Sequence, residues 1–430
     1  MTIKLITGHV VHFPNSTANP QQDTVEFKQG ALAIEDEKIV AVDSADKLKQ
    51  RYPEANIVDY GNKLIVPGFI DTHLHFPQTE MIASFGEQLI DWLNKYTFPT
   101  ERQFEDPAYS RKIADFFLQQ LWMNGTTTAA VWATVHKNSA EQLFSVAYER
   151  NMQLLTGKVC MDRHCPDYLQ DTPESAQKES AELIAQWHNK GRLKYAITPR
   201  FAPTSTEKQM AMLGELMSSY NDVYLQTHLS ENQQEIAWVK ELYPDCKNYL
   251  DVYDKYQMVT ERSLFGHCIH MEDDEWRVIS EKGGIVAFCP RSNLFLGSGL
   301  YNLDKANAFN IKTTLATDVG GGDSFSMLRT LGEAYKVFQL QNITMDPLAG
   351  LYMMTRGAAD ALQLPDIGDF NPGTYADFTV LDPHFNALSS LRLKDADKAE
   401  DILFALSMLA DERTTAATWI AGKPVWEYQQ

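Results

Sequence analysis

The sequence LIVPGFIDTHLH, residues 64–75, joins an apolar run to two histidines that stand two positions apart. Short apolar runs of this kind are typical of buried β-strands. Because alternate side chains of a strand face the same side, His73 and His75 both face one side near the carboxyl end of the run. Two converging imidazoles at that place suit a divalent metal ion, zinc above all. A His-x-His pair also arises by chance, so the prediction depends on what other segments bring to the same point.

Seven further apolar runs follow, with amphipathic helical stretches between them. The runs are Thr126–Trp132, Gln153–Met161, Leu193–Phe201, Val223–His228, Ser263–His270, Gly284–Pro290 and Thr313–Asp318, and the helical stretches include Tyr109–Met123, Ala140–Arg150, Glu174–Asn189 and Gln209–Tyr220. Alternating strands and helices imply a parallel sheet, because each crossover carries a helix. Eight such units predict an α/β fold with a closed (β/α)8 TIM-type barrel. An open doubly wound sheet is the alternative, which the lack of a GxGxxG string after the first strand disfavours.

Both ends of the chain have a different pattern, with short β-branched runs separated by polar turns. These runs are Ile3–Thr7, Val10–Phe13, Gly30–Ile34, Lys38–Val42, Tyr375–Leu381 and Thr418–Trp426, and Glu35-Asp36-Glu37 marks a hairpin. We expect the two groups to pair with each other in a small discontinuous β-sandwich domain. The predicted boundaries are residues 1–66 and 366–430 for this domain and 67–365 for the barrel.

Three more strand ends carry residues that bind metals. His228 closes one run and is followed by Glu231, the Ser263–His270 run carries His267, and the last run delivers Asp318 ahead of three glycines. In a barrel the carboxyl ends of the strands form the active site, so these side chains are expected to converge with the His-x-His pair. Three neutral histidines and one carboxylate leave an open position on zinc, as in catalytic sites. We predict one metal ion per chain.

In order and spacing, PGFIDTHLH and the strands of His228, His267 and Asp318 resemble the amidohydrolase superfamily. Longer strings resemble the guanine deaminase family within it. These strings are HFPQTEM (75–81), FGEQL (85–89), DWLNKYTFPTE (91–101), TPRFAP (198–203), CPRSNL (289–294) and TDVGGGDSFSM (317–327). The resemblance spans the whole barrel and extends to the flanking sheet domain.

The resemblance implies a role for each matching residue. Metal ligands would be His73, His75, His228 and Asp318, and catalytic roles would fall to Glu231, His267 and Asp318. Substrate contacts would come from His75, Gln78, Arg200, Phe201, His228, Glu231 and Asp318, with Gln78, Arg200 and Phe201 positioning the purine. For Arg200 the alternative is a structural ion pair, and for Phe201 and Trp92 it is core packing, which we favour for Trp92. His270 is expected behind the site or in the core.

The function implied is hydrolysis of guanine to xanthine and ammonia, with a zinc-activated hydroxide attacking C2 and Glu231 moving protons. The guanidinium of Arg200 matches the adjacent O6 and N7 acceptors of guanine. Two alternatives stay open: the same site acting on another purine, a pterin or a triazine, and a non-catalytic barrel that binds partners.

Composition limits the partners. The 430 residues carry 38 Lys and Arg against 57 Asp and Glu, a net charge of −19. So acidic a surface repels nucleic acid and anionic lipid, and no run of apolar residues is long enough to span a membrane. Five scattered cysteines without a CxxC pair favour a reducing compartment. We expect a cytoplasmic enzyme, and the family resemblance favours a homodimer.

Overall fold

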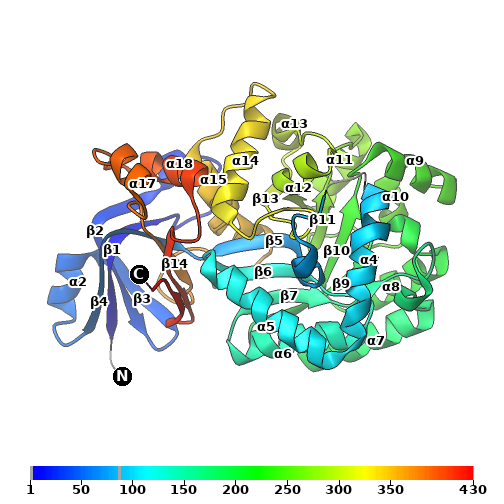
Figure 1. Cartoon of the computed structure of the whole chain (residues 1–430), viewed down its shortest axis with the longest axis horizontal. Coiled ribbons are helices and arrows are strands. Elements are labelled where there is room, and N and C mark those ends of the chain that lie inside the picture. Colours follow the sequence, from blue (N-terminus) through cyan, green and yellow to red (C-terminus); the bar gives the residue numbers. More distant parts are fainter. Residues whose placement is uncertain (1–2, 86–88, 430) are drawn as a thin grey trace.

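A computed structural model describes residues 3–85 and 89–429 of the chain. The barrel strands form a parallel path in the order β13-β12-β11-β10-β9-β7-β6-β5, and the short β8 pairs with β9. The strands are β5 (Phe69–His75), β6 (Thr126–Trp132), β7 (Gln153–Gly157), β8 (Val159–Cys160), β9 (Leu193–Pro199), β10 (Tyr224–Leu229), β11 (Ser263–His267), β12 (Ile285–Phe288) and β13 (Lys312–Leu315). The predicted barrel is confirmed, and it occupies the right of Figure 1.

Helices surround the barrel and fill the crossovers. They are α5 (Pro107–Met123), α6 (Lys137–Glu149), α7 (Pro173–Trp187), α8 (Glu207–Ser218), α9 (Gln233–Leu242), α10 (Tyr249–Asp254), α11 (Asp273–Lys282), α12 (Pro290–Phe295), α13 (Leu303–Ala308), α14 (Met327–Gln339), α15 (Pro347–Met353) and α16 (Arg356–Ala361). Their starts follow from the sequence: Asp106 accepts a hydrogen bond from Ala108 N, and Thr172 and Ser175 form a capping box ahead of α7. After β5 the chain runs through short turns, η1 (Phe76–Met81), α3 (Leu89–Trp92), η2 (Leu93–Thr97), α4 (Phe98–Glu101) and η3 (Arg102–Glu105). Two more 3₁₀ turns are η4 (Asp167–Leu169) and η5 (Ala202–Thr204).

The two ends of the chain share one seven-stranded sheet, in the order β16-β15-β14-β4-β1-β2-β3, on the left of Figure 1. Its strands are β1 (Lys4–His12), β2 (Val25–Glu35), β3 (Lys38–Ser44), β4 (Asn56–Pro67), β14 (Phe378–Leu381), β15 (Thr415–Ile420) and β16 (Lys423–Glu427). The helices α1 (Pro20–Asp23), α2 (Ala45–Arg51), α17 (Ala387–Arg392) and α18 (Ala399–Leu409) accompany it. A small β domain built from both termini is therefore confirmed. The domain boundaries given above stay a prediction.

The apolar run that opens the barrel belongs to two sheets, so its interpretation as one barrel strand was wrong for its first part. Residues 64–67 lie in β4, antiparallel to β14, and the barrel strand β5 begins at Phe69. Gly68 makes the passage: a Cβ there would lie 2.1 Å from Oγ1 of Thr127. A bare backbone is required because the two sheets meet so closely. The last run also ends earlier than expected, because β13 stops at Leu315 and leaves Asp318 in the following loop.

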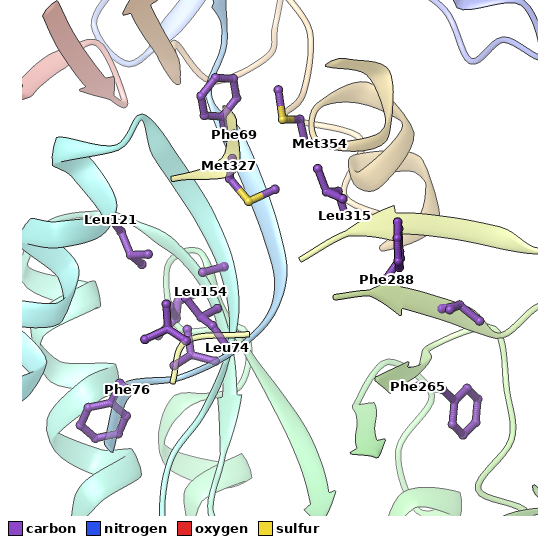
Figure 2. Close-up of a cluster of buried hydrophobic side chains, with 14 of the residues drawn as sticks. Phe69, Leu74, Phe76, Leu121, Leu154, Phe265, Phe288, Leu315, Met327 and Met354 are labelled. Atoms are coloured by element: carbon purple, nitrogen blue, oxygen red, sulfur yellow. The ribbon is translucent and has the colours of Figure 1, made fainter. Parts of the chain in front are cut away.

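Two apolar layers hold the barrel. At its amino end, Ile70, Ala130, Leu155, Ala196, Tyr224, Leu264 and Ile285, one from each of seven strands, pack against Ala358 and Ala359 of α16 and Leu362 just after it. On the outside, Leu74, Leu154 and Leu315 belong to the larger core that includes Leu121 of α5 and Met327 of α14 (Figure 2). With its amino end filled, the barrel is accessible to a ligand at its carboxyl end. In the described part of the chain no helix is both long and apolar enough to cross a bilayer.

A buried ion pair links the terminal sheet to the barrel. Arg192, just before β9, donates to Asp377, just before β14, and their side chains are 3% and 2% exposed. Asp377 also accepts a hydrogen bond of 2.8 Å from Ala421 N. Removing the charge of Asp377 would leave the guanidinium buried without its counterion.

We predict that Asp377→Asn lowers the free energy of unfolding by about 3 kcal/mol, measured by urea denaturation. The control is Asp397→Asn, which breaks a pair with Lys28 whose side chains are 57% and 72% exposed and should leave the denaturation midpoint unchanged. Equal midpoints for both variants would contradict the role given to the buried pair.

Candidate active site

Four side chains predicted as metal ligands lie together at the carboxyl end of the barrel. Nε2 of His73 and Nε2 of His75 are each 3.4 Å from Oδ1 of Asp318. Nε2 of His228 lies 3.3 Å from Nε2 of His75. One nitrogen from each of the three histidines falls within a span of 4.8 Å. Segments separated by more than 240 residues thus meet at one point.

The chemistry of these donors fits a divalent cation. Burial, helped by neighbouring histidines, lowers the pKa of His75 to about 3 and that of His228 well below its ordinary value, so both rings are neutral and can offer a lone pair. Nδ1 of His228 is held 2.7 Å from the backbone oxygen of Arg200, which leaves Nε2 for the centre. Nε2 of His73 is buried and has no hydrogen-bond partner among the described residues. Three imidazoles beside one carboxylate match the preferences of zinc.

A second grouping at the same place contains His73, His267, Cys289 and Asp318. Burial raises the pKa of the Cys289 thiol well above its usual value, and its Sγ donates to the backbone oxygen of Ala287 at 3.4 Å. The three-histidine grouping offers more imidazole nitrogens, two of them 3.4 Å from Oδ1 of Asp318, and is the better metal centre.

Asp71 fixes Asp318 against the His-x-His strand. Its carboxylate accepts hydrogen bonds from Oγ1 and N of Thr317, at 2.5 and 3.1 Å. Asp318 N in turn donates to the backbone oxygen of His73 at 2.8 Å. Burial alone would raise the pKa of Asp318, but the surrounding histidines, His73 first, hold it well below its ordinary value. Asp318 is thus an anion at the ligand position.

Glu231 and His267 form the second part of the site. Oε2 of Glu231 is 3.5 Å from Nε2 of His267, and Oε1 accepts a hydrogen bond of 2.9 Å from Oγ of Ser298. Nδ1 of His267 lies 2.8 Å from Oδ1 of Asn293. Burial opposes a charge on His267, but Glu231 and Asp318 raise its pKa above the ordinary value. An ionisable carboxylate and an imidazole therefore stand side by side next to the metal-type cluster.

The residues that hold the Glu231 carboxylate carry no strand-end pattern that would have predicted them. Ser298 lies in a loop, and its backbone oxygen is 2.8 Å from Nε2 of His270, which explains why His270 stands behind the site. Glu235 accepts from the backbone N–H groups of Glu231 and Asn232 and from Tyr249. Burial and the charge of Glu231 raise the pKa of Glu235 to about 7. The Asn-x-x-Glu capping-box spacing at 232–235 was the available signal for Glu235.

A cavity of about 440 Å³, part of it open to solvent, adjoins the cluster. Its lining consists of His75, Gln78, Trp92, Leu93, Arg200, Phe201, His228, Glu231, Glu235, His267, Leu296, Asp318 and Gly321. Every predicted site residue except His73 is in this lining. Trp92, for which packing was favoured, does both: it is 2% exposed and borders the cavity. Residues 86–88 of the FGEQL string lie outside the described residues.

Arg200 forms a buried ion pair, which was the alternative to its predicted role in substrate binding. It also lines the cavity. Its Nη1 donates to both carboxylate oxygens of Glu101 at 3.0 Å. Nε2 of Gln78 donates to the same carboxylate at 3.3 Å. The two roles considered for Arg200 are compatible, because a guanidinium has five N–H donors.

Comparison with known proteins gives consistent matches. The sequence profile of the Amidohydrolase family matches residues 64–425. Guanine deaminase of Escherichia coli is 47% identical over 99% of this chain and 98% of its own length, and the probable guanine deaminase of Deinococcus radiodurans is 35% identical over 99% of each. A crystal structure of guanine deaminase from C. acetobutylicum with guanine bound in its active site superposes with a TM-score of 0.90, at 29% identity over 99% of this chain and all of that one. The structure of the E. coli enzyme superposes with a TM-score of 0.96, at 45% identity over all of both chains.

The barrel and its histidine-rich mouth are thus those of a hydrolase, and the chain belongs to the Amidohydrolase family. Within that family it is an enzyme of the guanine deaminase group. The resemblance found in the motif strings is therefore confirmed.

We predict that the purified chain holds one divalent metal ion and that His228→Ala lowers its metal affinity at least about tenfold. Metal content after equilibration with limiting zinc is measured by mass spectrometry, alongside the thermal midpoint with and without chelator. The matched control is His384→Ala, an exposed histidine outside the cluster, which should bind metal like the parent. Equal metal content in the two variants would exclude His228 as a ligand.

Proposed function

We propose that this enzyme hydrolyses guanine to xanthine and ammonia. One observation supports the proposal above others: a single cavity, partly open to solvent, joins the metal-type cluster and Glu231 to the purine-matching pair Gln78 and Arg200. The curated relatives named guanine deaminase and the relative with guanine in its active site agree with this substrate.

His73, His75, His228 and Asp318 are proposed to hold one zinc ion per chain. When bound, the ion supplies a water molecule acidic enough to react as hydroxide at neutral pH. Two hydrogen bonds hold the ligand set in place: Nδ1 of His228 donates to the backbone oxygen of Arg200, and Oγ1 of Thr317 donates to Asp71.

Arg200 and Gln78 are proposed to orient guanine. The free N–H groups of Arg200 donate to O6 and N7, two adjacent acceptors on one edge of the purine. Phe201, which is 4% exposed, supplies an apolar wall, and His75 and His228 also line the cavity. Guanine so held presents C2 and its amino group to the histidine cluster.

Glu231 is proposed to move the protons. It takes a proton from the attacking water and gives it to N3, where negative charge develops as the oxygen bonds to C2. Glu231 then takes the remaining proton from the hydroxyl group on C2 and gives it to the amino group. The C2–N bond breaks, ammonia leaves, and the oxygen stays on C2 as the carbonyl of xanthine. His267, 3.5 Å from Glu231, donates to the developing negative charge, and Asp318 accepts a hydrogen bond from the attacking water.

Three further proposals concern the whole protein. The chain divides into a terminal β domain (1–66 and 366–430) and a barrel (67–365), works in the cytoplasm, and forms a homodimer. A solution mass of one chain by light scattering would overturn the last of these.

The direct test incubates metal-loaded protein with guanine and follows the loss of guanine absorbance together with released ammonia. We expect one ammonia for each xanthine formed. Turnover of a pterin or a triazine in preference to guanine would overturn the proposed substrate.

We predict that Glu231→Gln lowers kcat by about 10²–10⁴-fold, because the amide cannot carry the proton. Metal content and the KM for guanine should stay close to those of the parent. The exposed substitution Glu241→Gln, which makes the same chemical change away from the cavity, should leave kcat unchanged. Near-normal turnover by metal-loaded Glu231→Gln would contradict the proton-transfer role.

A further inference from the structure

Glu101 is a fully buried carboxylate directly behind the purine end of the cavity. It ends α4, in the irregular segment after β5, and has no exposed surface. It is absent from the cavity lining, whereas its two partners, Arg200 and Gln78, are both in it. Its carboxylate therefore acts on a ligand only through these side chains.

The contacts of Glu101 restrain both partners. Two hydrogen bonds of 3.0 Å run from Nη1 of Arg200 to the two carboxylate oxygens, and one of 3.3 Å runs from Nε2 of Gln78. The Gln78 amide is held from its other end as well, because Gly320 N donates to Oε1 at 3.4 Å. Among the described residues, no acceptor is bonded to Nε or Nη2 of Arg200, so these are the donors left for a ligand.

Charge gives this contact a second effect. Arg200 shares the cavity with Glu231 and Asp318. The proposed reaction requires that neither carboxylate forms an ion pair with Arg200. A buried guanidinium without a counterion is strongly disfavoured, so without Glu101 it would pair with one of these two carboxylates. Glu101 supplies the counterion on the far side and keeps the cation at the purine end.

We infer that Glu101 is a positioning residue that sets Arg200 and Gln78 for a 6-oxopurine. The inference rests on the proposed function and deepens it. With Nη1 fixed, the remaining N–H groups of Arg200 can donate to an oxygen at position 6 of the purine. A 6-amino group would instead place its own N–H groups against these donors, and no hydrogen bond could form. The site would therefore discriminate strongly against 6-aminopurines.

The test compares Glu101→Gln and Glu101→Asp with the parent, all metal-loaded. Steady-state kinetics with guanine are combined with the inhibition constant of 2-aminopurine, which is guanine without its C6 oxygen. We expect Glu101→Gln to raise the KM for guanine about tenfold to a hundredfold, the effect of a lost charge-assisted hydrogen bond. kcat should stay within about threefold, since binding is weakened equally before and during reaction. The 2-aminopurine constant should change much less, and Glu101→Asp should restore part of the guanine KM.

Asp377→Asn is the matched control, because it also removes the carboxylate of a buried arginine pair but lies outside the cavity lining. It should lower stability without changing the KM. The inference would be overturned if Glu101→Gln raised the KM for guanine and the inhibition constant of 2-aminopurine by the same factor. It would also be overturned if the KM for guanine did not change. If the parent releases no xanthine, the proposed function fails by itself, and guanine dissociation constants of the same variants by calorimetry then decide the role of Glu101.

Discussion

The hydrogen bonds between Asp71 and Thr317 hold the first and last strands of the barrel together at its mouth. The hydroxyls of Thr72 and Thr314 also meet at 2.7 Å across the same seam. The His-x-His pair and Asp318 stand on opposite sides of this seam. The relative positions of these side chains therefore depend on barrel closure: Asp318 and the two histidine rings of β5 become neighbours because the two ends of the sheet meet.

Arg200 connects the metal-type cluster with the purine end. Its backbone oxygen fixes the ring of His228, and its side chain reaches Glu101 and the cavity. A shift of this one residue would move the ring of His228 and the proposed substrate contact together. The distance between the two halves of the site is thus set by a short stretch of backbone at the end of β9. A residue next to a rigid strand is positioned more precisely than a residue in a loop.

Local patterns were enough to predict which histidines meet at the mouth of the barrel. Alternation along a strand puts His73 and His75 on one side, and a position at a strand end brings His228 and His267 to the mouth. The supporting residues were beyond such patterns. Glu101 is 99 positions from Arg200 and lies in irregular turns, and Ser298 lies in a loop 67 positions from Glu231. Only tertiary contacts reveal these partners.

The first apolar run shows a different limit. Its residues are continuous in sequence, yet the chain passes from the terminal sheet to the barrel at Gly68. A glycine is needed there because Thr127 leaves no room for a side chain. A hydrophobicity pattern reports burial and not the identity of the partner strand. The predicted barrel was therefore right while the start of its first strand was wrong.

The pairing of β4 with β14 has a consequence for biosynthesis. Leu64 faces Leu381 across the sheet, so the strand leading into β5 lacks one neighbour until more than 300 further residues have been translated. Contacts so distant along the chain form slowly. The nascent protein must carry its histidine pair on an incompletely supported strand for most of synthesis, and the ribosome-bound chain is expected to acquire metal affinity only near the end.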